Sequence, residues 1–514
     1  MEKIEKEIEK RKEKVLGKFR GWLKDPHNLA FFIILIAAFI VRIWIFTKTS
    51  QQPIWWDEAD YMSTAKRWGL NLDIKDTWYY RRGFLWPLIC SVFFRIGLGE
   101  IGIRFFIVLL SAGIVALTYF LISLMFNKKI ALLASLAAAV SWIYLFFTGR
   151  TMTEIPATFF LLLATLFFWK GYVKEENKKF MWLFALFLAL SVLVRFQFAM
   201  MAFPFFLFIL IRERGKMFKN ENLWLTLIIF LLVLSPLLYI YTKHYGNPIT
   251  DIASYYFDVG QTEETGHWHW AGIFNYFKDL PYILSVYLLV PFLIGNAIYF
   301  SDLIFGFDKI FSSPELQKKL FILFFIAIPF LVLGYMGALY VEQRYIMMTL
   351  PFIYSIASMP FIYAQKFFKS RALAYFFVIV FMLLLIPNFT LGKNLTESKA
   401  TSYLEVKEAA LWMKQNSNPG DTIITMSVPQ TIYYSERMAY SYGGGPNQDK
   451  FQTPEEMESL AREVDAKYFV VSVFEPNIPQ WAYTYGQTHP NNPKPVQAYA
   501  QGQQPVLVIY EFIK

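Results

Sequence analysis

The sequence Ile54-Trp55-Trp56-Asp57-Glu58-Ala59-Asp60-Tyr61 follows the first long apolar segment of the chain, Leu29–Phe46. Its two adjacent carboxylates, Asp57 and Glu58, are flanked by aromatic residues where a membrane helix is expected to emerge into water. Nothing in the hydrophobic bulk of the chain requires these charges. They are the feature expected of a membrane protein that carries out chemistry at its surface.

Composition places the chain in the class of multi-pass membrane proteins. Its 514 residues are 56% hydrophobic and only 17% charged, with a mean hydropathy of +0.37, and apolar segments of bilayer-spanning length recur along the first three quarters. The single cysteine, Cys90, excludes an internal disulfide and a cysteine-based zinc site. The net charge of +10 comes from short basic clusters between apolar segments, so we expect no nucleic-acid partner.

Hydrophobicity predicts a polytopic α-helical protein with about 11 transmembrane helices. The expected spans are Leu29–Phe46, Ile103–Phe126, Ile130–Phe147, Ile155–Trp169, Phe180–Val194, Phe196–Ile211, Leu223–Tyr241, Ile283–Phe300, Leu320–Leu339, Tyr345–Tyr363 and Leu373–Phe389. Residues 84–98 form a shorter apolar run interrupted by Pro87, and we interpret it as an interfacial helix.

The distribution of lysine and arginine predicts the topology. With the N-terminus in the cytoplasm, every inner segment carries a basic cluster, as the positive-inside rule requires. If residues 84–98 crossed the membrane, all later loops would invert. We therefore expect a cytoplasmic amphipathic segment over 1–28, a transmembrane domain over 29–391 with its first outer loop at 47–102, and an outer-face domain over 392–514.

The C-terminal region has the alternating pattern of a small soluble α/β domain. We predict no regular structure over Gln480–Gln504, which is rich in Tyr, Gln, Asn and Pro. The expected elements are helices over Tyr403–Asn416 and Thr453–Val464 and strands over Thr422–Met426, Lys467–Val473 and Pro505–Phe512.

Charged residues from distant parts of the chain fall at one membrane level in this topology. Glu154 begins the fourth span, Arg195 lies at the turn between the fifth and sixth, and Arg344 lies at the outer end of the tenth. Singly, each has an ordinary explanation, as a helix N-terminal charge, a turn residue or an interfacial anchor. Their convergence with Asp57 favours a functional site, because charges at that depth are costly unless they pair or bind a ligand.

A further outer loop, Gln261–Trp270, carries Glu263, Glu264, His267 and His269. A strand would put both histidines on one face, which suits a zinc site. An aromatic interfacial belt with incidental polar residues explains the loop more simply. A loop that binds the acceptor is an intermediate interpretation.

The motifs, in this order and topology, resemble the GT-C fold membrane glycosyltransferases. The nearest branch is that of the protein O-mannosyltransferases and aminoarabinose lipid A transferases. A single proline at Trp86-Pro87 and Glu154 in place of the commoner aspartate depart from the pattern and leave the branch open. The matching segments are Asp57-Glu58-Ala59-Asp60-Tyr61, Pro87-Leu88, Gly97 to Arg104, Thr153-Glu154-Ile155-Pro156, and Glu342-Gln343-Arg344-Tyr345 with Pro351.

The resemblance implies a transmembrane catalytic domain that moves a sugar from a polyprenyl-phosphate donor to an acceptor on the outer face, with inversion. The acceptor is a protein, a lipid or a glycan. Asp57 is our candidate general base, and Glu58 and Glu154 are assigned to the catalytic group with it. Glu154 is assigned to position the acceptor or to help hold a divalent cation, Mg²⁺ or Mn²⁺.

Arginines are the expected ligands of the donor phosphate, because guanidinium groups bind phosphate oxygens bidentately. We assign Arg344, Arg195, Arg81 and Arg82 to this role. Three other readings stay open. A transporter or flippase of polyprenyl-linked lipids or sugars also buries charges, although the sequence shows neither internal repeats nor broken helices. An oligosaccharyltransferase would be expected to carry Trp-Trp-Asp in its C-terminal domain, whereas here Trp55-Trp56-Asp57 lies in the first loop and the C-terminal region has no such motif. A scaffold whose outer domain binds surface glycans is the third.

The topology can be tested by labelling single cysteines in intact cells after Cys90 has been replaced. We expect a cysteine at position 450 to react with an impermeant reagent from outside and one at position 128 to be protected. The reverse pattern, or outside labelling of position 128, contradicts the orientation.

Overall fold

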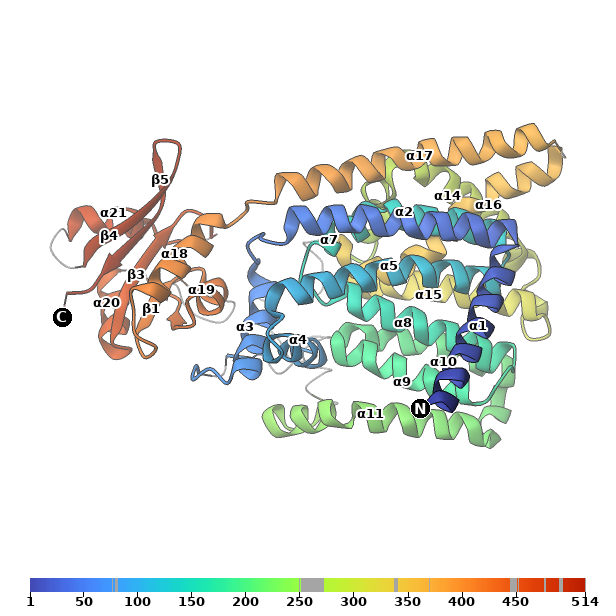
Figure 1. The fold of residues 1–514 in the computed structure, drawn as a ribbon, viewed down its shortest axis with the longest axis horizontal. Helices are drawn as coiled ribbons and strands as arrows, with labels where there is room; N and C mark the ends of the chain where they lie inside the picture. Colours follow the sequence, from blue (N-terminus) through green and yellow to red (C-terminus); the bar gives the residue numbers. More distant parts are fainter. Residues whose placement is uncertain are drawn as a thin grey trace.

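A bundle of long helices with a mixed sheet domain at one end makes up the structure, a computed structural model (Figure 1). It describes residues 1–75, 77–78, 82–248, 250, 272–336, 341–368, 370–443, 451, 453–475, 478–489 and 493–513. The helices of the N-terminal and bundle regions are α1 (Glu2–Leu23), α2 (Pro26–Thr49), α3 (Trp56–Leu70), α4 (Leu85–Arg95), α5 (Gly99–Met125), α6 (Lys128–Val140), α7 (Trp142–Thr148), α8 (Glu154–Phe168), α9 (Lys179–Val194), α10 (Ala202–Glu213), α11 (Glu221–Tyr245), α13 (Asn275–Lys278), α14 (Leu280–Phe305), α15 (Pro314–Met336), α16 (Leu350–Phe368) and α17 (Arg371–Ser398).

Within the described residues, nine helical segments are long and apolar enough to cross a membrane. The pair α6 and α7 makes a tenth, bent by 48°, and α9 is a shorter apolar helix. The predicted polytopic helical fold is therefore confirmed. The span predicted over Ile130–Phe147 corresponds to this pair, and it is broken at Ser141, whose backbone leaves the helical region at φ −58°, ψ 124°.

A buried arginine explains how the broken span is tolerated. Arg42 of α2 is fully buried and donates to the carbonyls of Ala138 and Ala139, the last turn of α6, at 3.4 and 3.1 Å. Its Nε donates to Ser111 Oγ at 2.8 Å. Carbonyls at a helix C-terminus lack intrahelical donors and attract positive charge. Arg42 thus stabilises the break, after which α7 leads to Gly149 and the polar loop beyond it.

The C-terminal domain is a five-stranded sheet with the order β2-β1-β3-β5-β4. The first three strands in this order run parallel, whereas β5 is antiparallel to β3 and to β4. Its elements are α18 (Leu404–Gln415), β1 (Thr422–Thr425), α19 (Val428–Ser435), β2 (Met438–Tyr440), α20 (Pro454–Glu463), β3 (Ala466–Ser472), α21 (Gln480–Thr488), β4 (Lys494–Gln501) and β5 (Gln504–Glu511).

The prediction of no regular structure over Gln480–Gln504 was wrong, because this stretch contains α21 and β4. β4 is an edge strand whose side chains are largely exposed, so it needs no apolar alternation. A tight turn at Gly502, with φ +65°, joins it to β5. Glycine adopts this left-handed conformation without a steric penalty.

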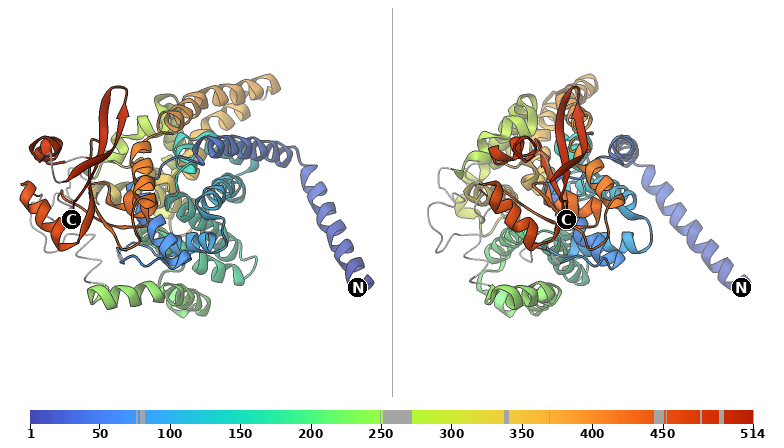
Figure 2. Two further views of the ribbon diagram at one scale, coloured as in Figure 1. Left: turned by 60° about the vertical axis from the view of Figure 1, so that its left-hand side comes forward. Right: turned by 90° about the vertical axis from the view of Figure 1, so that its left-hand side faces the viewer.

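Both ends of the membrane domain are helical. The N-terminal segment forms α1, which projects from the bundle (Figure 2). At the other end, α17 runs without a break to Ser398, so the helix passes through the domain boundary expected at residues 391–392. The stretch 84–98 contains the short apolar helix α4, and its interfacial location stays a prediction.

We predict that Arg42→Met destabilises the protein by about 2–4 kcal/mol, because buried carbonyls are left without a donor. The measurement is the thermal unfolding midpoint of the purified protein in detergent. Lys48→Met, which removes an exposed basic group from the same helix, is the control and should leave the midpoint within about 1 °C. Equal midpoints for the two variants would contradict the capping role.

Candidate active site

The candidate site lies at the end of the bundle that faces the C-terminal domain, where α3 begins (Figure 1). Trp55 has an extended backbone and caps α3, and the Glu58 side chain accepts the Trp55 backbone N–H at 2.7 Å. This hydrogen bond satisfies the backbone N–H at the start of the helix and fixes its first turn. Asp57 therefore belongs to the first turn of a well-anchored helix, and this helix lies beside the C-terminal domain (Figure 1).

Four charged residues from distant segments meet here, as the sequence predicted. Glu154, fully buried at the start of α8, forms ion pairs with Arg195 at 3.1 Å and with Arg344 Nε at 3.3 Å. The other end of the Arg344 guanidinium reaches Asp57 Oδ2 at 2.9 Å. Arg344 also lies 3.2 Å from Glu342. A single guanidinium thus connects the carboxylates of α3 and α8.

Arg82, an expected phosphate ligand, lies on the other side of Asp57. Its guanidinium is 3.5 Å from Asp57 and 2.8 Å from Asp60, one turn along the same face of α3. Arg195 is engaged differently, because it donates to Thr153 Oγ1 at 2.8 Å and stacks over Tyr345. Arg344 and Arg82 therefore contact Asp57 directly, whereas Arg195 acts on Glu154.

The two aspartates of this helix differ in acidity. Burial raises the pKa of Asp57, but the charges of Arg344 and Arg82 outweigh it, so the pKa lies below its ordinary value. Burial raises the pKa of Asp60 to about 6, against the opposing charge of Arg82. Asp57 is consequently ionised at neutral pH, and Asp60 changes its charge in the mildly acidic range.

Glu58, although adjacent to Asp57, points into a separate buried network. Its carboxylate accepts the Thr151 backbone N–H at 2.6 Å and pairs with Arg150 at 3.2 Å. Arg150 in turn stacks on the Trp55 indole, 3.4 Å from the ring centre. Glu58 therefore ties the start of α3 to the loop between α7 and α8 and is fully occupied in doing so.

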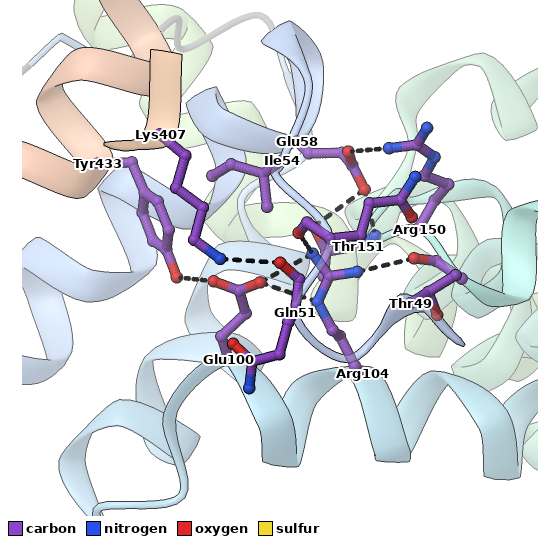
Figure 3. Close-up of polar contacts among 12 residues, drawn as sticks. Thr49, Gln51, Ile54, Glu58, Glu100, Arg104, Arg150, Thr151, Lys407 and Tyr433 are labelled. Carbon is purple, nitrogen blue, oxygen red and sulfur yellow. Dashed lines mark hydrogen bonds and ion pairs between the residues drawn. The ribbon is translucent and has the colours of Figure 1, made fainter. Parts of the chain in front are cut away.

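A second arginine, Arg104 of α5, extends this network towards the C-terminal domain (Figure 3). It donates to the carbonyls of Gln52 at 2.7 Å and Gly149 at 2.8 Å, and it pairs with Glu100. Glu100 then accepts the hydroxyl of Tyr433 in α19 at 2.7 Å. The α2–α3 loop, the α7–α8 loop and the C-terminal domain are thus joined through the ion pair of Arg104 with Glu100.

An apolar cavity of about 340 Å³ adjoins the charged cluster. Arg82, the residue shared with the cluster, supplies the only charged side chain that lines it among the described residues. The cavity is lined by Trp68, Trp78, Arg82, Phe84, Leu88 and Ile240. Elements α3, α4 and α11 therefore border a partly open apolar space that the Arg82 side chain also lines.

Part of the predicted site lies outside the described residues, namely Arg81 and the loop with Glu263, Glu264, His267 and His269. Among the residues that the structure describes, no group of three or more His, Cys, Asp or Glu side chains could hold a metal ion. Asp57 and Glu154 are compensated by guanidinium groups there. This arrangement does not fit a divalent cation, so we assign no step to one; the cation stays an untested prediction.

Sequence reasoning did not single out Asp60, Glu342, Arg150 or Arg104 as parts of the site. The signal for Asp60 was available, since residues three apart share a helix face. Glu342 belongs to the segment Glu342-Gln343-Arg344-Tyr345, two residues before Arg344. No sequence spacing indicates that Arg150 meets Glu58 or that Arg104 meets Gln52.

Comparison with known proteins agrees with this architecture. Residues 81–240 match the family model described as dolichyl-phosphate-mannose-protein mannosyltransferase. A protein of Aquifex aeolicus, described as uncharacterized, is 32% identical over 160 residues, which are 30% of this chain. The chain spans about a third of the length of that curated relative, 32%.

Two solved structures share the fold. ArnT from Cupriavidus metallidurans, bound to undecaprenyl phosphate, superimposes with a TM-score of 0.61 at 13% identity, over 93% of this chain and 97% of that one. The Archaeoglobus fulgidus oligosaccharyltransferase, tethered to an acceptor peptide, gives a TM-score of 0.62 at 13% identity, over 88% and 70%. The predicted resemblance to the GT-C membrane glycosyltransferases is confirmed, and this multi-pass membrane protein has the GT-C fold.

The raised pKa of Asp60 predicts a pH dependence of stability. In the unfolded chain the pKa of an aspartate is about 4, whereas that of Asp60 in the folded protein is about 6. Between these two pH values the folded state binds more protons than the unfolded state does. The free energy of unfolding therefore falls as the pH rises through this interval. Asp60→Asn should remove this pH dependence. The unfolding midpoint of the variant should therefore rise relative to that of the wild type from pH 4 to pH 6, and the difference between the two midpoints should stay constant above pH 6. Asp73→Asn, an exposed position just after α3, is the control. A pH-independent difference for Asp60→Asn would contradict the assignment.

Proposed function

We propose that the protein is an inverting membrane glycosyltransferase that moves a sugar from a polyprenyl-phosphate donor to a hydroxyl acceptor on the outer face. The observation that carries the proposal is the Asp57 carboxylate held between two guanidinium groups, Arg344 at 2.9 Å and Arg82 at 3.5 Å. Such a transfer requires a base for the acceptor hydroxyl and positive charge at the leaving phosphate. Asp57 is suited to the first role, and Arg344 and Arg82 are suited to the second. The GT-C fold and the undecaprenyl phosphate in the ArnT structure support the choice of donor.

The donor is placed by its two chemically different ends. Its phosphate lies at Arg82 and Arg344, because guanidinium groups bind phosphate oxygens through paired hydrogen bonds. The first isoprenoid units enter the apolar cavity between α3, α4 and α11, which Arg82 also lines. The sugar then faces Asp57. Arg82 is thus the link between the lipid and the reacting centre.

In the transfer step, the acceptor oxygen forms a bond to the anomeric carbon while the bond from that carbon to the phosphate oxygen breaks. The hydroxyl proton passes to Asp57, and the electron pair of the breaking bond stays on the phosphate. The leaving phosphate gains negative charge, which Arg344 and Arg82 stabilise. Attack opposite to the leaving phosphate inverts the anomeric configuration.

Donor binding would also prepare the base. Without donor, the charges of the two arginines keep the pKa of Asp57 low, which makes it a weak proton acceptor. When the phosphate takes up the positive charge of Arg344 and Arg82, this electrostatic stabilisation of the carboxylate decreases and its basicity increases. Asp57 thus becomes a better base when the donor is in place.

The remaining carboxylates position these groups. Glu154 holds Arg195 and Arg344 from the buried side, so we assign it to orienting Arg344 rather than to proton transfer. Glu58 anchors the start of α3 through Thr151 and Arg150. The donor is a lipid-linked sugar, and the acceptor is a hydroxyl-bearing protein, lipid or glycan.

The test is transfer of labelled sugar from polyprenyl phosphate by the purified protein in nanodiscs, with membrane extract as the source of acceptor. Asp57→Asn should lower the rate by roughly 10²–10⁴-fold, the usual loss for a general base, with donor affinity retained. Arg344→Lys should instead weaken donor binding, because the charge remains but the paired geometry is lost.

Asp73→Asn serves as the exposed-carboxylate control. Full transfer by Asp57→Asn would refute the base role, and unchanged donor affinity in Arg344→Lys would refute the phosphate role. A transporter or flippase predicts a different outcome, since the wild type would then show no transfer at all.

A further inference from the structure

The C-terminal domain packs on the helix that carries Asp57. Its α19 lies against α3, and the Tyr434 hydroxyl accepts the Ile54 backbone N–H at 2.9 Å, just before the helix begins. At the far end of α3, Lys66 donates to the Tyr433 carbonyl at 3.0 Å and pairs with Glu436 at 2.7 Å. The domain therefore contacts both ends of α3.

One further contact reaches the residue beside Asp57. Glu475, in the loop after β3, is only 6% exposed. One carboxylate oxygen accepts the indole N–H of Trp56 at 2.5 Å and the other accepts the Ser427 hydroxyl at 2.6 Å. A buried carboxylate is costly unless hydrogen bonds compensate it. Here the compensating donors are neutral, and one of them belongs to the membrane domain.

We propose that Glu475 is a positioning residue of the active site: by holding the indole of Trp56, it fixes the first turn of α3 and hence the direction of the Asp57 carboxylate. The inference rests on the proposed function. The start of α3 is then held by two carboxylates that belong to different domains. Glu58 anchors it to the α7–α8 loop, and Glu475 anchors it to the C-terminal domain.

The geometry distinguishes this role from simple docking of the domain. Trp56 remains 39% exposed, so its indole is not placed there to fill the core. Its hydrogen bond fixes an orientation that burial alone leaves free. Misplacement of a reacting group by about 1 Å can cost roughly 10²-fold in rate. The contact at Lys66, by contrast, joins the same two domains at the end of α3 away from Asp57.

The experiment compares variants of the full-length protein in nanodiscs. Glu475→Ala and Trp56→Phe should each lower kcat by about 10- to 100-fold, with the donor Kd changed less than about twofold. Combined, the two should cost little more than either alone, because they break the same hydrogen bond. Glu475→Gln should restore most of the rate, since its amide oxygen can accept from Trp56 and its NH₂ can donate to Ser427.

Glu436→Gln is the matched control, because it weakens the ion pair of Glu436 with Lys66 at the same interface, and with it the pair with Lys414 inside the C-terminal domain. It should affect the unfolding midpoint but not kcat. The inference is overturned if Glu436→Gln lowers kcat as much as Glu475→Ala does, or if the losses of Glu475→Ala and Trp56→Phe add.

A readout independent of catalysis is amide hydrogen exchange of residues 54–61, measured by mass spectrometry. It should accelerate in Glu475→Ala and stay unchanged in Glu436→Gln. Unchanged exchange in Glu475→Ala overturns the inference. If the wild type transfers no sugar, the proposed function fails, and exchange alone then decides whether Glu475 holds the start of α3.

Discussion

The buried carboxylate of Glu154 is the constraint on which the arrangement of the site depends. A fully buried negative charge at the start of α8 must be compensated from neighbouring elements, and Arg195 and Arg344 supply the compensation. Because Arg344 also reaches Asp57, the requirement of one buried charge fixes the relative positions of α3, α8, α9 and the segment before α16. The broken span stabilised by Arg42 adds to this, since it leads the chain into the loop that ends at Glu154.

The alternation of basic clusters and apolar spans was sufficient to predict that Asp57, Glu154, Arg195 and Arg344 meet. Such a prediction works because the order of the spans assigns each connecting segment to one side of the bilayer. Charged residues at one membrane level then have few possible partners other than each other. It could not separate Asp57 from Glu58. These neighbours in sequence point in different directions on α3, and only the contacts of Glu58 with Arg150 and Thr151 show that it is committed to structure.

Prediction was weaker where polar side chains build structure through distant partners. The residues 480–504 have too little apolar periodicity to indicate α21 and β4, because an edge strand can remain largely exposed. Glu475 is an ordinary loop glutamate in the sequence, and its contact with Trp56 spans more than 400 residues, at |i−j| = 419. No local pattern encodes such a pair. The interface of the two domains could therefore be described only from the structure.

The charge balance around Asp57 is the physical basis of the proposed catalysis. In the absence of donor, Asp57, Glu154 and Glu342 neutralise Arg344, while Arg82 is shared between Asp57 and Asp60. A phosphate that enters must compete with these carboxylates. Glu154 is buried and Asp60 keeps its own contact with Arg82, so the phosphate displaces the exposed carboxylates, and of these only Asp57 contacts both guanidinium groups. In the proposed mechanism, the Asp57 carboxylate released in this exchange is the one that takes the proton of the acceptor hydroxyl. Binding of an anionic donor and creation of a free base are therefore two consequences of a single exchange of ion-pair partners.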